Sequence, residues 1–142
     1  MAGIGLAKAR TIIRKVLEAG EAAQMKPLSV VVVDAGGHVV AFERSDGSPP
    51  GRFEIARAKA YGCIMFGQGG TAMAALAERL PGFSAAAVVW HHGQVASVPG
   101  GVLVRDSRGR VIGAIGVTGD TSENDRDLGV AAVEAAGFVP EG

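Results

Sequence analysis

The feature that most constrains the fold is the apolar run at residues 28–33, Leu-Ser-Val-Val-Val-Val. Four consecutive β-branched residues disfavour a helix, because branching at Cβ restricts the side chain against the preceding turn. Apolar side chains at successive positions face both sides of a strand, so this strand is predicted to be central in a sheet. Residues 34–37, Asp-Ala-Gly-Gly, favour a tight turn, and residues 38–44 are again extended. An antiparallel hairpin is therefore predicted.

Helices are predicted on both sides of this hairpin from apolar periodicity and from the residues that interrupt it. The first ends at Pro27, and the last opens at Ser122-Glu123-Asn124-Asp125, which matches a capping box. The apolar face of the first helix includes Leu6. The four predicted helices cover residues 4–25, 52–66, 71–79 and 122 to about 136.

Three short extended segments are predicted at residues 94–98, 102–105 and 110–117, where they would form a meander. Residues 83–90 are apolar and rich in alanine, which leaves a strand and a packed loop as open alternatives. Together with the hairpin, the meander predicts an α/β fold of the α+β type, a five-stranded antiparallel sheet flanked by helices. A doubly wound parallel sheet would instead require strands and helices to alternate singly.

Length and charge limit the possible partners. A chain of 142 residues is predicted to form a single domain over residues 1–142. Fourteen basic residues balance fourteen acidic ones, so no long-range field would attract nucleic acid or a membrane, and neither is expected as a partner. Apolar residues make up 48% of this small chain, which favours a homo-oligomer that covers part of that surface.

The cytoplasm is the expected location. The first twenty residues mix apolar and basic side chains and lack the apolar stretch of a signal peptide. Cys63 is the single cysteine, which fits a reducing compartment, and it is expected to be a small core residue. His91 and His92 are adjacent and would point to opposite faces if extended, so no metal site is predicted.

The predicted helix at residues 52–66 carries the best candidates for ligand binding. Arg57 and Lys59 suit a carboxylate or propionate if they border the sheet, although a solvated charged face is the alternative. The segment Pro99-Gly100-Gly101 would add exposed backbone N–H groups from its two glycines, because glycine lets a ligand approach the chain closely.

Other side chains could complete such a site. His38 follows the two hairpin glycines and is the best available imidazole for a ligand or proton-transfer role. Tyr61 and Met65 share the 52–66 helix, where core packing is preferred over a position facing a pocket. A lysine such as Lys59 in an apolar cleft requires an acidic partner, and Glu54 or Asp125 is predicted to provide it.

Several segments of the chain carry a resemblance to a known family. They are Val33-Asp34-Ala35-Gly36-Gly37-His38, Phe42-Glu43-Arg44, Asp46-Gly47, Ala58-Lys59-Ala60, Pro99-Gly100-Gly101-Val102, Gly113-Ala114-Ile115-Gly116-Val117, Gly119 and Glu123-Asn124-Asp125. In these segments the chain resembles the GlcG/HbpS family, a domain also found at the C-terminus of PduO-type proteins and often labelled haem-degrading. The resemblance spans about residues 2–137. It implies a profilin-like or PAS-like antiparallel sheet and assembly from dimers to octamers.

Three functions follow as hypotheses. The resemblance implies a small-ligand or cofactor-binding protein, with haem as the expected cofactor, Arg57 and Lys59 near its acidic groups and His38 as the imidazole. The second is a small-metabolite isomerase, tautomerase or lyase in a catabolic pathway that uses Lys59, His38 or Asp125 for proton transfer. The third is an accessory structural oligomer in which the glycines serve packing alone.

Overall fold

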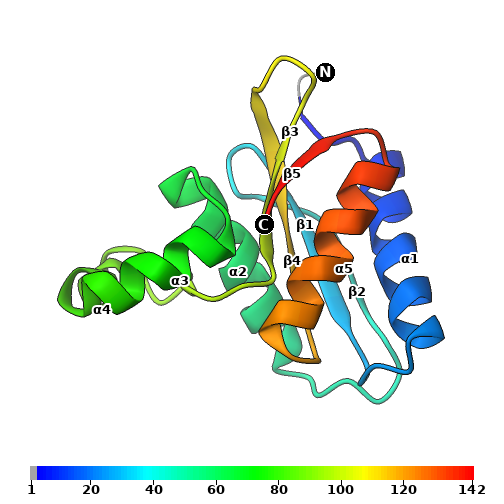
Figure 1. The fold of residues 1–142 in the computed structure, drawn as a ribbon, viewed down its shortest axis with the longest axis horizontal. Helices are drawn as coiled ribbons and strands as arrows, with labels where there is room; N and C mark the ends of the chain where they lie inside the picture. The colour runs from blue at the N-terminus through cyan, green and yellow to red at the C-terminus, as the bar shows by residue number, and fades with distance from the viewer. Residues whose placement is uncertain (1–2) are drawn as a thin grey trace.

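The computed structural model describes residues 3–142, which form a five-stranded sheet and five helices (Figure 1). The elements in chain order are α1 (Leu6–Ala22), β1 (Ser29–Asp34), β2 (Val39–Arg44), α2 (Arg52–Phe66), α3 (Gly70–Arg79), α4 (Pro81–Trp90), β3 (Gly101–Arg105), β4 (Val111–Thr118), α5 (Ser122–Ala135) and β5 (Val139–Glu141). The predicted hairpin, its central strand and the helix at residues 52–66 are confirmed.

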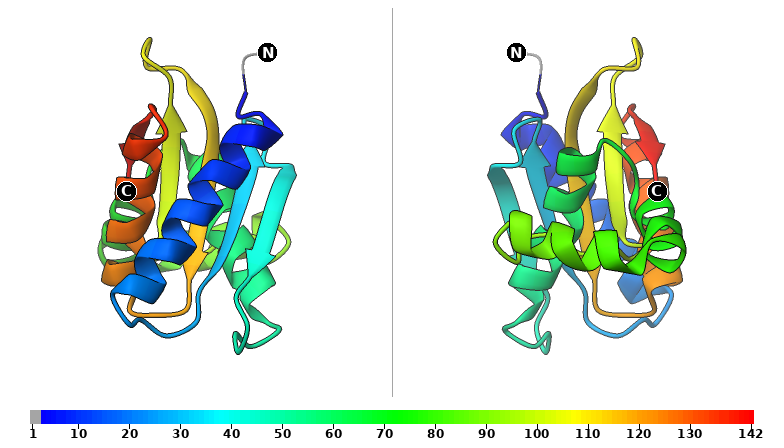
Figure 2. Two further views of the ribbon diagram at one scale, coloured as in Figure 1. Left: turned by 90° about the vertical axis from the view of Figure 1, so that its right-hand side faces the viewer. Right: turned by 90° about the vertical axis from the view of Figure 1, so that its left-hand side faces the viewer.

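The sheet is antiparallel throughout, with strand order β2-β1-β4-β3-β5. Successive residues of β1 serve opposite faces, as the period of a strand requires. Val30 and Val32 pack beneath α1 and α5, whereas Val31 and Val33 pack beneath α2. The helices therefore form a layer on each side of the sheet, and β1 is buried on both faces as predicted (Figure 2).

Helices α3 and α4 leave this layered body. They extend sideways beyond α2 and form an arm in which α4 packs against α3 (Figures 1 and 2). Residues 83–90 are part of α4, so both alternatives considered for them, a strand and a packed loop, are wrong. Pro81 stands in the first turn of α4, where its fixed φ suits a helix start and its missing N–H is not needed.

The predicted meander is wrong because residues 94–98 form no strand. Val95 is buried, and the Ala96 N–H donates to the carbonyl oxygen of Ala58 at 3.1 Å, so this segment lies against α2 instead of the sheet. The fifth strand is β5, which pairs with β3 and contains Pro140. An edge strand tolerates proline because one row of its N–H groups needs no partner.

Two helix ends also differ from the predictions. Helix α1 covers Leu6–Ala22 instead of residues 4–25, and Leu6, expected on its buried face, is exposed. Helix α5 is capped by Thr121, whose Oγ1 accepts from the Asn124 N–H at 3.1 Å, so Ser122 is inside the helix. Within residues 3–142, every helix falls short of the length and apolar character needed to cross a membrane.

Candidate functional site

The structure divides the predicted site residues between two places. Lys59, Asp125, Gly100 and Gly101 meet at a buried position, which we call the Lys59 junction, and the half-buried Pro99 precedes the two glycines. Arg57 and His38 belong instead to the surface on the other side of α2. The seven predicted site residues therefore do not form one site.

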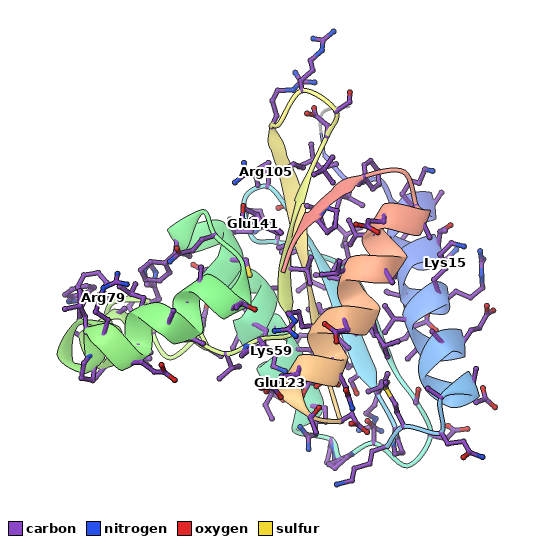
Figure 3. The ribbon with its side chains drawn as sticks, in the orientation of Figure 1. Lys15, Lys59, Arg79, Arg105, Glu123 and Glu141 are labelled. Atoms are coloured by element: carbon purple, nitrogen blue, oxygen red, sulfur yellow. The ribbon has the colours of Figure 1, made fainter. Side chains whose placement is uncertain are left out.

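At the Lys59 junction, Lys59 points from α2 towards the first turn of α5 (Figure 3). The side chain is 4% exposed, its Nζ donates to the carbonyl oxygen of Val117 at 2.8 Å, and it lies 3.6 Å from Asp125 Oδ2. Asp125 is thus the acidic partner that was predicted, whereas Glu54 is exposed. The ion pair connects the helix on one face of the sheet with a helix on the other.

Asp125 is satisfied on one oxygen only. Its side chain is 1% exposed, and Oδ1 accepts from the Asp120 N–H at 3.1 Å, whereas Oδ2 has no hydrogen-bond partner among residues 3–142. Burial raises the pKa of Asp125, an effect that the nearby Lys59 ammonium opposes. Burial likewise lowers the pKa of Lys59, and the charge of Arg52 adds to that shift. Burial thus disfavours charge on both members of the pair.

The glycines of the junction make room for α2. A Cβ on Gly100 would lie 2.7 Å from Lys59 Nζ, and a Cβ on Gly101 would lie 2.6 Å from the Lys59 carbonyl oxygen. On the neighbouring strand, a Cβ on Gly116 would overlap the Ala56 carbonyl oxygen. Gly100 and Gly101 are buried, so the expectation that they expose backbone N–H groups is wrong. The space that these glycines leave is therefore occupied by Lys59 and the backbone of α2.

Cys63 lies beside this packing, with Sγ 2.7 Å from the position of a Cβ on Gly101. It is buried, and burial raises the pKa of the thiol to about 12. The predicted core role of Cys63 is confirmed, because its side chain is buried in the apolar cluster between α2 and the sheet. A thiol with a raised pKa stays protonated at neutral pH.

A polar rim borders the junction at the end of β4. Arg52 Nη1 donates to Thr118 Oγ1 at 3.0 Å. Asp120 accepts from Asn124 Nδ2, from the Thr121 N–H and from the Lys26 N–H, and these bonds lower its pKa to about 2. The sequence analysis missed this rim, although Asp120 directly before an N-cap threonine is a typical position for a carboxylate that accepts backbone N–H bonds.

The second place is the outer side of α2, which we call the Tyr61 face: Arg57, Tyr61, Met65, His91 and the hairpin turn Gly37-His38. The rings of Tyr61 and His91 meet edge to face, with centroids 6.3 Å apart. A Cβ on Gly37 would lie 2.9 Å from Tyr61 Cδ2 and 3.6 Å from Met65 Cε. Tyr61 therefore joins the hairpin turn to the end of α4, and neither Tyr61 nor Met65 is buried.

Arg57 and His38 stand at two ends of this face. Arg57 lies one helical turn before Tyr61 in α2. Its Nη2 donates to Gln94 Oε1 at 3.3 Å. His38 is exposed, and its backbone N–H donates to Asp34 Oδ1 at 2.9 Å, which holds the turn. His91 was not singled out as a site residue from the sequence, because its contact with Tyr61 depends on α4, which the sequence did not predict.

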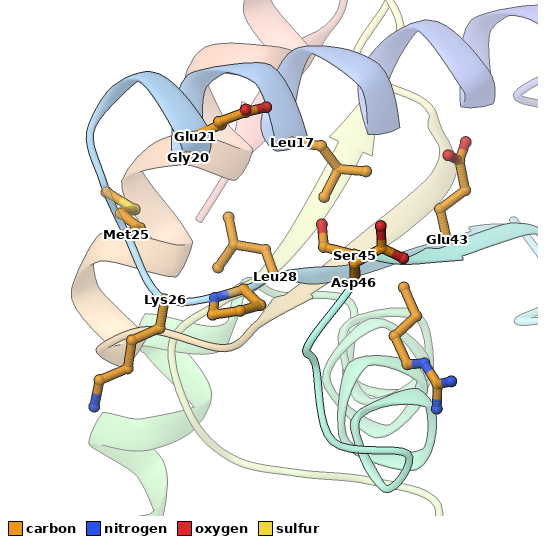
Figure 4. Close-up of a pocket in the computed structure, with 11 residues that line it drawn as sticks. Leu17, Gly20, Glu21, Met25, Lys26, Leu28, Glu43, Ser45 and Asp46 are labelled. Carbon is orange, nitrogen blue, oxygen red and sulfur yellow. The ribbon is translucent and has the colours of Figure 1, made fainter.

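A separate cavity of about 540 Å³ opens between the end of α1 and the β1–β2 pair (Figure 4). Leu17 and Leu28 lie within it, and carboxylates of Glu21, Glu43 and Asp46 border it. Its lining includes no predicted site residue: it consists of Leu17, Gly20, Glu21, Met25, Lys26, Pro27, Leu28, Glu43, Arg44, Ser45 and Asp46. It offers iron no imidazole or thiolate ligand.

Solved structures share this fold along nearly the whole chain. The crystal structure of a PduOC:heme complex has a TM-score of 0.85 at 22% identity and covers 96% of each chain. Protein ORFY of Klebsiella pneumoniae has a TM-score of 0.84 at 25% identity, covering 94% of this chain and 90% of its own. An HbpS double mutant of Streptomyces reticuli has a TM-score of 0.81 at 24% identity, covering 95% and 88%.

Sequence comparison identifies the family. An uncharacterised 15.0 kDa protein from the dhaT-dhaS intergenic region of Citrobacter freundii is 32% identical over 124 residues, which are 85% of this chain and 86% of the relative. The family model described as haem degrading protein HbpS-like matches residues 4–134. This chain therefore belongs to the HbpS-like family.

Proposed function

We propose that the protein binds haem, or a closely related flat and acidic cofactor, at the Tyr61 face. The observation that carries the proposal is that one side of α2 presents a guanidinium, an aromatic ring and a thioether, Arg57, Tyr61 and Met65, at successive turns, with the imidazole of His91 against the ring of Tyr61. Family membership supports the same ligand class. The buried Lys59 junction and the acidic cavity supply no such combination.

The donor set of this face fits haem by its chemistry. An imidazole nitrogen is a common axial ligand of haem iron, and the face offers His91 and His38. Arg57 would pair with a propionate, because a guanidinium forms charge-assisted hydrogen bonds with carboxylates. Tyr61 and Met65 would contact the apolar macrocycle. When bound, haem would supply a redox-active iron.

Haemin titration followed by visible absorption tests this proposal. We expect saturable binding by the unmodified protein, weakened by roughly 1–3 kcal/mol in Arg57→Ala because a charge-assisted bond is lost. His91→Ala and His38→Ala should differ, since the one that removes an axial ligand shifts the Soret band. Arg10→Ala, on the exposed side of α1, is the matched control. Unchanged binding in Arg57→Ala and both histidine variants, or no binding by the unmodified protein, would contradict the proposal.

A second candidate function rests on the Lys59 junction. Asp125 Oδ2 lacks a hydrogen-bond partner, and burial lowers the pKa of the neighbouring Lys59, which are the conditions for a proton-transfer pair. A small carboxylate metabolite would have to replace Asp125 beside Lys59. If it does, Lys59→Ala weakens its binding by roughly 1–3 kcal/mol. Calorimetric titration of Lys59→Ala and of the unmodified protein with a panel of small carboxylates tests this candidate function. Equal affinities of the two proteins would exclude it.

The remaining predictions concern assembly, cellular location and partners. We propose a homo-oligomer, from a dimer to an octamer, in the cytoplasm, with a small molecule as ligand and neither nucleic acid nor membrane as partner. The balanced charge of 14 basic and 14 acidic residues supports the last two statements. Light scattering and cell fractionation test the assembly and the location. If the protein is instead an accessory structural oligomer, the Tyr61 face holds no cofactor and haemin titration shows no binding.

A further inference from the structure

The cavity between the end of α1 and the β1–β2 pair shares no residue with the Tyr61 face, and neither candidate function uses it. Its volume of about 540 Å³ is within the range typical of small-molecule sites, about 300–1,000 Å³. Leu28, which is 3% exposed, and the half-buried Leu17 lie within it and also pack in the core beneath α1 (Figure 4). The cavity therefore has an apolar floor that the fold itself holds in place.

The register of the β1–β2 pair decides which charges face this floor. Glu43 is paired with Val30, whose side chain packs beneath α1, so Glu43 points to the α1 side of the sheet. Arg44 is paired with Ser29 and points to the opposite side. Figure 4 shows Lys26 extending away from the cavity. The two cationic side chains of the lining therefore point away from the apolar floor.

The carboxylates of the lining are left without a cation. Glu21, Glu43 and Asp46 belong to α1, to β2 and to the loop after β2, and none of them forms an ion pair among residues 3–142. Arg14, in the adjoining recess, pairs with Glu18 at 3.8 Å instead. The last turn of α1 has no basic residue, although the partial negative charge at the carbonyl end of a helix favours a cation. The side-chain charges and the helix end thus both favour a cation in the cavity.

We infer that the cavity binds an aliphatic diamine or polyamine, with ammonium groups at the carboxylates and methylene groups over Leu17 and Leu28. Among residues 3–142, no three acidic, histidine or cysteine side chains lie close enough together to hold one metal ion. The carboxylates therefore suit charges spread along a ligand instead of one compact cation. The floor lets the methylene groups between those charges leave water, a gain that a hydrated metal ion would not have. This inference goes beyond the proposed haem binding.

Calorimetric titration of the unmodified protein with spermidine tests the inference. We expect saturable binding with one spermidine per chain. Butylamine has a single charge, and Mg²⁺ has two charges but no methylene groups, so both should bind at least about tenfold more weakly. Absence of saturable binding, or equal affinities for spermidine and Mg²⁺, would overturn the inference.

Two diamines separate the contribution of the apolar floor from that of the charges. Trimethylenediamine and hexamethylenediamine carry the same two ammonium groups and differ only in the methylene chain between them. Hexamethylenediamine should bind more tightly, by about threefold or more, because its additional methylene groups are removed from water over Leu17 and Leu28. An affinity that is independent of chain length would contradict the role of the floor.

Glu21→Gln and Glu43→Gln each remove one carboxylate at an exposed position, so the fold should be unaffected. Each should weaken spermidine binding about two- to fivefold, as expected for an exposed ion pair, and the double variant should weaken it about tenfold. Glu134→Gln, at an exposed position of α5, is the matched control and should bind spermidine like the unmodified protein. An unchanged affinity in the double variant would overturn the inference.

The same proteins distinguish this cavity from the proposed haem site. The double variant should bind haemin like the unmodified protein, and Arg57→Ala should leave spermidine binding unchanged, because the two sites share no residue. Weaker spermidine binding in Arg57→Ala would contradict the assignment of spermidine to the cavity, whatever the haemin titration shows.

Discussion

The Lys59 junction and the α3–α4 arm differ in how far the rest of the chain buries their side chains. At the junction, glycines bring the backbone of α2 directly onto β3 and β4, and even a lysine is buried with its partner. On the arm, large apolar side chains are left exposed. The junction is completed by contacts within the chain, whereas the arm leaves apolar side chains uncovered by residues 3–142. Substitutions should therefore be costly to folding in the first region and nearly neutral in the second.

Gly116→Ala should have the largest effect. The added Cβ would overlap the Ala56 carbonyl oxygen, so α2 would have to move away from the sheet. We expect a loss of more than about 5 kcal/mol in the free energy of unfolding, or no folded protein. The same substitution on the arm, Gly82→Ala, meets no atom within 4 Å and should be neutral or stabilising. Urea denaturation of both variants measures their free energies of unfolding. Equal losses in Gly116→Ala and Gly82→Ala would contradict the difference between the junction and the arm.

Lys59→Met should cost about 3–5 kcal/mol at neutral pH, because it leaves the carboxylate of Asp125 buried without a cation. The double variant with Asp125→Leu should recover most of that loss. Without the ammonium that lowers it, the pKa of Asp125 in the folded protein rises further above its unfolded value. A group of this kind stabilises the fold below its unfolded pKa, and that stability is lost as pH rises through the folded pKa.

The penalty of Lys59→Met should accordingly shrink from pH 8 towards acid. Denaturation midpoints of the variant and the unmodified protein between pH 4.5 and pH 8 measure it. A penalty independent of pH would show that Asp125 is not the group left without its partner.

Gly37→Val tests the border between the layered body and the Tyr61 face. Gly37 has a φ of +83°, which a β-branched residue rarely adopts, and its new side chain would also displace Tyr61. We expect a loss of about 1–3 kcal/mol. Gly109→Val has a similar φ of +78°, and a Cβ there meets no atom of residues 3–142 within 4 Å, so the difference between the two variants isolates the Tyr61 contact. Identical thermal shifts would mean that Tyr61 adjusts without cost.

Val89→Ser should have the smallest effect on the unfolding of the protomer, within about 0.5 kcal/mol, because an exposed side chain contributes little to the fold of its own chain. Denaturation at a concentration low enough to dissociate any oligomer measures this value. A larger loss there would mean that Val89 supports the arm itself.

The sequence predicted elements whose patterns are local. The valine run of β1, the turn after it and the α2 boundaries follow from β-branching, positive φ and helix-breaking glycines. It did not predict α4, because an apolar, alanine-rich segment without charges has no period that distinguishes buried from exposed positions. Strand β5 was missed because it has three residues, one of them proline, and exists only through pairing with β3.

The candidate site was predicted in part for the same reason. That Lys59 needs an acidic partner followed from the cost of an unpaired buried charge, whereas the choice of Asp125 over Glu54 depends on the fold. Which side of α2 each residue occupies depends on how α2 crosses the sheet, and Arg57 and Lys59 consequently lie in different surroundings. The contact of Tyr61 with His91 requires α4, which no local pattern indicated.

The short strand β5 has a consequence for solubility. An open sheet edge can template the addition of strands from other molecules, which leads to aggregation. At one edge, β5 has three residues, and Pro140 has no N–H to offer an incoming strand. Glu141 holds it in place by accepting from Arg105 Nη2 at 3.1 Å and from the Gly69 N–H at 2.9 Å. At the other edge, β2 ends in the charged and exposed Glu43 and Arg44. Both edges are thus protected against extension into fibrils, so the sheet of one copy is a poor template for the strands of another.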